Sequence, residues 1–182
     1  MELPIRTERL VLRELTMDDL DDHARMYADP SVVRHLYSEV LDREGATEHL
    51  TARLVGGLPP EGEWRNLAVE SDGRFLGEAG VKLVSAEHLR CEIGYVFLPE
   101  AGGHGFATEA AAAMVQLAFT EMNAHRVEAR LDARNTSSAR LLERLGMRLE
   151  GHLRETEFVK GEWTDELVYG ITRDEWDALR SR

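Results

Sequence analysis

The chain has 182 residues, a length typical of one domain, so we expect residues 1–182 to form a single domain. Its 22 Lys and Arg residues against 34 Asp and Glu residues give a formal net charge of −12, which argues against nucleic acid as a partner because an acidic surface repels phosphate. A lone cysteine, Cys91, excludes an intrachain disulfide and a Cys-rich metal site, and the absence of a secretory signal and of a run of about 18 apolar residues predicts a cytoplasmic protein with no membrane partner.

The first third of the chain predicts one strand and two helices. Residues 6–15 alternate between apolar and polar side chains, as a strand with one buried face does. Thr16 begins a capping box and opens a predicted helix over residues 17–28. A second helix is predicted over residues 42–55, where it meets a pair of glycines and then a pair of prolines.

The middle of the chain predicts the centre of a sheet. Residues 64–83 alternate on both sides of a turn at residues 71–73, which indicates a β-hairpin. Another strand is predicted over residues 89–98 and ends at Pro99. A glycine-rich loop follows, and then a helix over residues 107–121 with an apolar stripe.

The last third repeats the order of strand, loop and helix. A strand is predicted over residues 126–132, followed by a helix that ends at Gly146. Two strands over residues 147–159 and 164–171 come next, and Thr172 caps a short final helix. Helices on both sides of several strands indicate an α+β protein, an α/β sandwich, and not a bundle or a barrel.

The glycine-rich loop suits an anion. Gly102, Gly103 and Gly105 lie between the end of a strand and the start of a helix. Glycine allows a positive φ and a close approach of the backbone, and the helix start adds unpaired N–H groups with a partial positive charge. The loop lacks the Lys-Ser/Thr of a P-loop and the spacing of a Rossmann fingerprint, and glycines in such a connection also suit an ordinary turn.

Two signatures carry a family resemblance. Residues 102–110, GGHGFATEA, resemble the cofactor loop of the GCN5-related N-acetyltransferase (GNAT) superfamily, and residues 135–147, NTSSARLLERLGM, are similar to its Asn-x-x-Ser segment and following helix. With residues 6–13, residues 92–95 and the tail up to Trp176, the resemblance covers nearly the whole chain. Within the superfamily it is closest to the group that includes the RimJ/RimL-type ribosomal-protein N-terminal acetyltransferases.

The resemblance implies a fold and a co-substrate. It implies a central mixed, mostly antiparallel sheet with helices on both faces, in which two strands splay and let the pantetheine of acetyl-CoA pair with one of them. The loop amides would hold the pyrophosphate, and Asn135 would contact the pantetheine; no metal is implied. The residues expected to bind acetyl-CoA are Val96, Phe97, Leu98, Gly103, His104, Gly105, Phe106, Ala107, Thr108, Asn135 and Ser138.

The chain departs from the family pattern at two positions. Glu100 stands where relatives commonly have Gln or Arg, which places an anion near the predicted phosphate site. Leu142 stands where many relatives have the tyrosine that protonates the leaving thiolate. The first change predicts weaker cofactor binding, and the second means that another group must act as the acid.

Three residues are candidates for the proton transfers. Glu157 lies where the RimJ/RimL group has a glutamate with a base role, and Glu92 lies where other branches place their base. The resemblance favours Glu157 narrowly, and an ordinary solvated or ion-paired glutamate is an equal alternative for each. Ser138 matches the serine of the RimJ/RimL group and is the candidate acid, with a role as helix N-cap as the alternative.

The predicted function is therefore transfer of an acetyl group from acetyl-CoA to a primary amine by direct attack in a ternary complex. The acceptor would be a protein N-terminal α-amine or a small-molecule amine. Dimerisation is common in the family, so a homodimer is expected. The alternative is a catalytically weak acyl-CoA-binding sensor or assembly subunit, and a nucleotide-phosphate binder is a weaker one.

Overall fold

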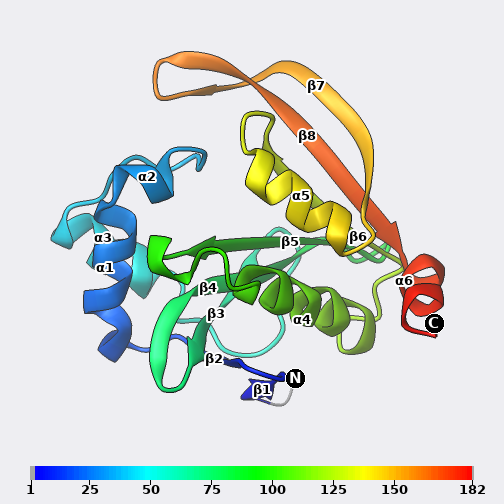
Figure 1. Ribbon diagram of the computed structural model, residues 1–182, viewed down its shortest axis with the longest axis horizontal. Helices are drawn as coiled ribbons and strands as arrows, with labels where there is room; N and C mark the ends of the chain where they lie inside the picture. Colours follow the sequence, from blue (N-terminus) through cyan, green and yellow to red (C-terminus); the bar gives the residue numbers. More distant parts are fainter. Residues whose placement is uncertain (1–2, 182) are drawn as a thin grey trace.

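The computed structural model describes residues 3–181 and contains one eight-stranded sheet with helices on both faces (Figure 1). The strand order is β1-β2-β3-β4-β5-β6-β8-β7, and every neighbouring pair is antiparallel except the parallel pair β5 and β6. This confirms the predicted α+β class and the mixed, mostly antiparallel sheet. The strands are β1 (Ile5–Arg6), β2 (Val11–Glu14), β3 (Trp64–Ser71), β4 (Arg74–Ser85), β5 (Arg90–Phe97), β6 (Arg126–Asp132), β7 (Arg148–Val159) and β8 (Glu162–Thr172), and the helices are α1 (Leu20–Ala28), α2 (Pro30–Val33), α3 (Arg43–Thr51), α4 (Phe106–Thr120), α5 (Thr136–Arg144) and α6 (Arg173–Arg180).

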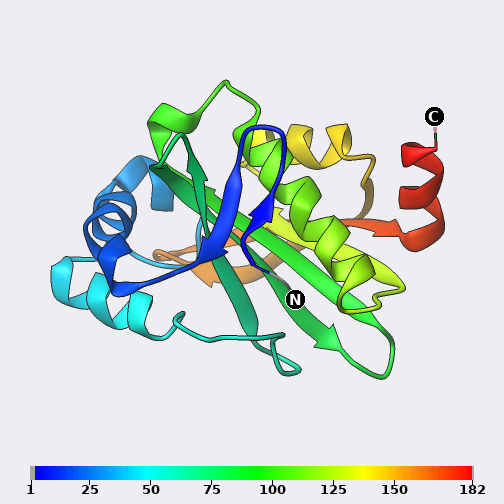
Figure 2. The same ribbon diagram turned by 90° about the horizontal axis from the view of Figure 1, so that it is seen from below.

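The helices divide between the two faces of the sheet because strand side chains alternate. On one face Ile93 of β5 packs with Met114 of α4 in the larger core. On the other face Ala68 of β3 packs with Met26 of α1 and Leu50 of α3 in a second core. Figures 1 and 2 show α1, α2 and α3 gathered together, with α4 running beside the central strands.

Two N-terminal elements differ from the sequence prediction. The strand expected over residues 6–15 is two short strands, because the Thr7 amide donates to the Leu10 carbonyl at 3.0 Å and closes a turn between them. Asp29 and Pro30 end α1 as predicted, but they also begin α2: the Asp29 side chain accepts from the Ser31 amide, and proline suits the first helical position.

Strands β5 and β6 pair along only part of their length. Their parallel register runs from Arg90 opposite Arg126 to Glu92 opposite Glu128, while β5 continues to Phe97 and β6 to Asp132. The two strands therefore diverge beyond Glu92. This is the splay that the family resemblance implies.

The β7–β8 hairpin extends beyond the rest of the sheet and arches over α5 (Figure 1). Its turn carries Lys160, whose ammonium donates to the carbonyl of Val33 and, at 3.0 Å, to that of Leu36. The tip of the hairpin is thus fastened to the segment that follows α2.

Candidate active site

Two cavities meet at the divergence of β5 and β6. The loop cavity, of 620 Å³, is bounded by the glycine-rich loop, the end of β5 and the start of α5. The sheet cavity, of 510 Å³, lies over β3, β4 and β5 beneath α1 and α3. Six residues line both cavities and form their junction: His35, Leu36, Tyr95, Val96, Asn135 and Ser138. A molecule that filled the loop cavity would reach the sheet cavity at this junction.

The loop presents free amide donors. Gly103 and Gly105 have φ of +80° and +79°, the left-handed region that glycine adopts without strain. Gly105 is the N-cap of α4, and none of the amides from Gly103 to Thr108 donates to a residue within 3–181. Free N–H groups at a helix start form an anion site. Most residues predicted to bind the cofactor line the loop cavity: Val96, Phe97, Leu98, Gly103, Gly105, Ala107, Thr108, Asn135 and Ser138.

Two predicted cofactor residues lie elsewhere. The His104 and Phe106 rings stack on each other with their centroids 5.6 Å apart and border a different hollow, beside β1 and β2. Arg9 lies 4.9 Å from the Phe106 ring centroid and donates to the His104 carbonyl at 2.8 Å. Their rings therefore lie outside the loop cavity.

The anion at Glu100 is turned away from the loop. Its carboxylate pairs with the guanidinium of Arg25 on α1, and this bond holds the pKa of Glu100 below its usual range. Glu100 lines neither cavity. The loop cavity instead contains a cation that sequence reasoning missed, Arg144 near the end of α5, which donates to the Thr108 hydroxyl at 3.4 Å.

Ser138 lies at the junction of the two cavities. The cap of α5 is Asn135, whose side chain accepts from the Ser138 amide at 3.1 Å, so the cap role expected as an alternative for Ser138 belongs to Asn135. Burial raises the pKa of Tyr95, also a junction residue, to about 12, and an interaction with the Ser138 hydroxyl opposes that rise. Sequence reasoning placed Tyr95 on a strand and did not single it out.

Leu142 occupies the position of the family tyrosine. Its side chain is fully buried in the larger core and also borders the sheet cavity. An apolar side chain at this position supplies no proton. Tyr95 and Ser138 are the hydroxyl groups at the adjacent junction.

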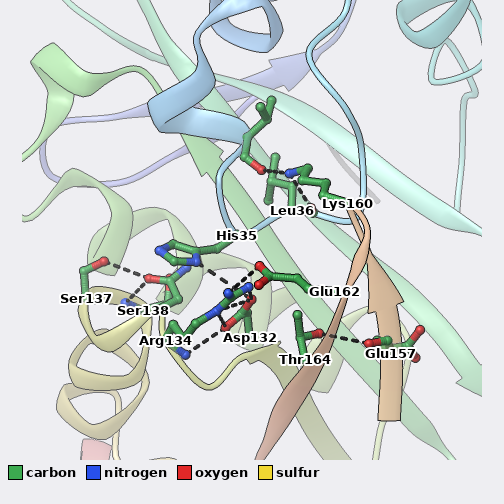
Figure 3. A network of polar contacts seen from close by, with 12 residues as sticks. His35, Leu36, Asp132, Arg134, Ser137, Ser138, Glu157, Lys160, Glu162 and Thr164 are labelled. Carbon is green, nitrogen blue, oxygen red and sulfur yellow. Dashed lines mark hydrogen bonds and ion pairs between the residues drawn. The ribbon is translucent and has the colours of Figure 1, made fainter. Parts of the chain in front are cut away.

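The two candidate bases lie in different environments. Glu92 lines the sheet cavity, and burial raises its pKa although Lys82 and Arg130 oppose the shift. Glu157 is exposed on the β7–β8 hairpin and lines neither cavity, and its carbonyl accepts from the Thr164 hydroxyl at 3.3 Å. In Figure 3, Thr164 lies between Ser138 and Glu157.

His35 is a junction residue that the sequence did not indicate. Its Nδ1 is buried without a hydrogen-bond partner in the described chain, and the nearest carboxylate, on Asp132, lies 3.9 Å away. The Arg134 guanidinium forms a salt bridge with that carboxylate at 2.6 Å and a second salt bridge with Glu162 of the hairpin (Figure 3). Burial lowers the pKa of His35, more than Asp132 raises it.

Comparison with known proteins decides the family. A family model described as an acetyltransferase (GNAT) domain matches residues 9–148. The chain belongs to the GNAT family of acetyltransferases. This enzyme is an N-acetyltransferase, as several of its relatives are named. One of them, the uncharacterized N-acetyltransferase p20 of Bacillus licheniformis, is 30% identical over 93% of this chain and 96% of that protein.

Two further likenesses concern the acceptor and the fold. The spermidine N(1)-acetyltransferase of Escherichia coli K12 is 26% identical over 92% of this acetyltransferase and 88% of its own length. RimL, the ribosomal L7/L12 alpha-N-protein acetyltransferase solved in complex with coenzyme A, has a TM-score of 0.82 at 17% identity, covering 96% of this chain and 99% of that one. The second likeness shows that the GNAT fold of this chain is also that of RimL.

Two features are absent from the described residues of the acetyltransferase: a membrane-spanning helix and a metal-binding group. No helix within residues 3–181 has the length and apolar character needed to cross a membrane. The same residues contain no group of three or more His, Cys, Asp or Glu side chains placed to hold a metal ion.

Proposed function

We propose that the enzyme transfers the acetyl group of acetyl-CoA to a primary amine by direct attack, with the cofactor in the loop cavity and the amine in the sheet cavity. The observation that carries this proposal is the junction, where the two cavities meet at the divergence of β5 and β6. Holding both reactants in one geometry supplies much of the rate enhancement in such reactions.

The loop cavity matches the parts of a coenzyme A thioester. The amides between Gly103 and Thr108 would bind the pyrophosphate, with Arg144 as an added positive charge. Successive amides of a strand point to opposite edges, so every second N–H of β5 beyond Glu92 faces the gap left by β6. These amides would pair with the pantetheine and stabilise the oxyanion that forms on the thioester carbonyl.

The proton that the nitrogen loses as the C–N bond forms would pass to Glu92. This carboxylate lies in the sheet cavity, and its raised pKa suits exchange of a proton near neutral pH. The thiolate would receive its proton from the Ser138 hydroxyl, and Tyr95, at the same junction, would resupply that proton. The exposed position of Glu157 outside both cavities favours Glu92 over it.

The acceptor is a primary amine, either on a small molecule or at a protein N-terminus. The relative that acts on spermidine supports the first, and the fold shared with RimL supports the second. The sheet cavity contains the carboxylates of Glu78, Glu92 and Asp132, which attract a cationic amine, and the guanidinium groups of Arg53 and Arg130. Association of two copies, expected from the family, remains a prediction.

The test is thioester consumption and product mass with a panel of amines. The purified enzyme is mixed with acetyl-CoA and with polyamines, amino-acid amides or peptides with free N-termini, and free thiol and acetylated amine are measured together. Equal amounts of both support the proposal. Binding of acetyl-CoA without turnover of any amine contradicts it.

A further inference from the structure

A triad of three hydrogen-bonded side chains borders the sheet cavity and has no part in the proton transfers described above. His23 of α1 is completely buried, and its Nδ1 is bonded to Oε1 of Glu78 on β4, which is 3% exposed. The other ring nitrogen, Nε2, lies 3.0 Å from Nδ1 of His49 on α3. Glu78 and His49 both line the cavity, whereas His23 lies between them.

A contribution to the stability of the fold does not by itself explain why these three side chains are placed together. Removing three ionisable groups from water is costly, and apolar side chains of similar size commonly pack in such a place at equal or lower cost. A hydrogen-bonded network that is largely buried, however, holds its members in one arrangement. The triad is therefore suited to a task that needs fixed ring orientations.

The triad of Glu78, His23 and His49 lies close to the proposed site of acetyl transfer. In the β4–β5 register the Cα partner of Glu78 is Val96, a junction residue at which the proposed function places the thioester arm. Directly opposed residues of an antiparallel pair are about 5 Å apart. The carboxylate end of the triad therefore lies one strand away from the cofactor arm, on the face that carries the sheet cavity.

The order of the bonds dictates where the protons lie. When Glu78 is ionised, it accepts from Nδ1–H of His23, so Nε2 of His23 has a lone pair and accepts from Nδ1–H of His49. Nε2 of His49 is then an unprotonated acceptor. Within residues 3–181 this nitrogen has no hydrogen-bond partner.

A proton added at this nitrogen does not have to stay there. The Nδ1 proton of His49 can pass to Nε2 of His23, and the Nδ1 proton of His23 can pass to Glu78. The triad then holds two neutral rings and one neutral carboxylic acid, and its net charge has changed from −1 to 0 without an imidazolium as an end state.

The surroundings of His49 favour this passage. Burial lowers the pKa of His49 to about 3, with the Arg53 guanidinium and His23 adding to the shift. The titratable and charged groups that face the ring are His23 and Tyr27 from α1, Arg53 from α3 and, through His23, Glu78 from β4. The Tyr27 ring centroid is 4.4 Å from that of His49, and Arg53 Nε is 3.8 Å from Oε2 of Glu78.

We propose that Glu78, His23 and His49 form a proton relay that removes one proton from the ammonium form of the acceptor before it attacks. The inference rests on the proposed function, because it assigns a step to an amine in the sheet cavity. The ammonium N–H bond breaks, its electron pair stays on nitrogen as the attacking lone pair, and the proton goes to Nε2 of His49 and on to Glu78. The second proton of the nitrogen goes to Glu92, and the relay returns its own proton to solvent by the reverse route.

The test compares two amines of the same length and different basicity. At neutral pH ethylamine is almost wholly ammonium, whereas 2,2,2-trifluoroethylamine is mostly free base and does not need the relay. Glu78→Gln keeps a hydrogen-bond acceptor for His23 but cannot take a proton. We expect it to lower kcat/KM at pH 7 for ethylamine by about 10²-fold and for trifluoroethylamine by less than about 2-fold, with the ethylamine loss shrinking as the pH rises.

A second variant and a control separate the relay from a structural effect. His49→Phe keeps a ring on the cavity wall and removes the entry nitrogen, and it should show the same difference between the two amines. Glu128→Gln removes a buried carboxylate that is 4% exposed and lines neither cavity, and any loss it causes should be equal for both amines.

The outcomes are distinct. Equal losses for the two amines in both relay variants, or no loss in either, overturn the relay and leave the proposed function standing. If the unmodified enzyme acetylates no amine at all, the proposed function fails, and the relay fails with it.

Discussion

At the scale of single residues, the cofactor loop depends on glycine for two separate reasons. Gly105 needs glycine for its φ of +79° and for the open space around its amide, where the nearest atom to an added Cβ is Arg9 Nη2 at 3.4 Å. A side chain would therefore cost backbone strain of roughly 1 kcal/mol and would add atoms at the N-cap of α4. The two effects can be measured apart.

We expect Gly105→Asp to abolish binding of acetyl-CoA, because its carboxylate adds negative charge to the amides that would hold the pyrophosphate. Calorimetric titration with acetyl-CoA measures this. Gly73→Asp in the β3–β4 turn is the matched control, since Gly73 has φ of +71° with nothing near an added Cβ and lies outside both cavities. Unchanged affinity in the Gly105 variant would contradict the assignment of the loop.

The two candidate bases give a second residue-scale prediction. Glu92→Gln should lower kcat by about 10²-fold or more at neutral pH, because it removes the carboxylate proposed to take the proton from the amine. Glu157→Gln should change kcat by less than about 3-fold, since an exposed carboxylate outside the cavity exchanges protons only with solvent. The pH dependence of kcat for both variants decides between them, and the reverse order would return the base to Glu157.

At the scale of elements, the tip of the β7–β8 hairpin is hydrogen-bonded to the segment that forms one wall of the junction. Lys160 bonds the carbonyls of Val33 and Leu36, and His35 and Leu36 line both cavities. Hydrogen bonds that involve a charged group contribute about 1.5–3 kcal/mol. The order of the wall is thus linked to a residue far away in the sequence.

Lys160→Met keeps the aliphatic stem and removes the donor. We expect faster amide hydrogen exchange in residues 34–38 and a KM for the amine raised by roughly 3- to 10-fold, which corresponds to the loss of about 1 kcal/mol of ordering. Arg74→Met on the exposed β3–β4 turn serves as the control. Exchange in residues 34–38 that matches the unmodified enzyme would show that the hairpin does not order this wall.

The same scale shows what could be predicted from the sequence. The cofactor loop could, because three glycines before a helix act through local backbone geometry. The relay could not, because His23, His49 and Glu78 come from three elements and only tertiary packing brings them together. Tyr95 was missed for a related reason: strand alternation places its side chain on a face of the sheet but does not show that it lies at the junction with Ser138.

At the scale of the whole molecule, the stability of this acidic protein depends on how its carboxylates are paired. Burial would raise the pKa of Asp19, but hydrogen bonds from Arg13 and Thr16 outweigh it and lower the pKa. The same balance lowers the pKa of Glu109, which accepts from Thr7 and Arg9. These two groups join the N-terminal segment to α1 and α4, so their protonation weakens contacts across the fold.

The sign of the pH dependence follows from these shifts. A carboxyl group whose pKa is lower in the folded state stabilises the protein above its unfolded pKa of about 4, and that stability is lost as the pH falls through the folded value. We therefore expect the free energy of unfolding, measured by urea titration, to fall steadily below about pH 4. Asp19→Asn should cost about 2 kcal/mol at pH 7, because it removes a 5% exposed carboxylate that pairs with Arg13. The difference should shrink as the pH falls below about 4 toward the lowered pKa of Asp19, and a difference that stayed constant as the pH fell would show that the cap and not the charge provides the stability.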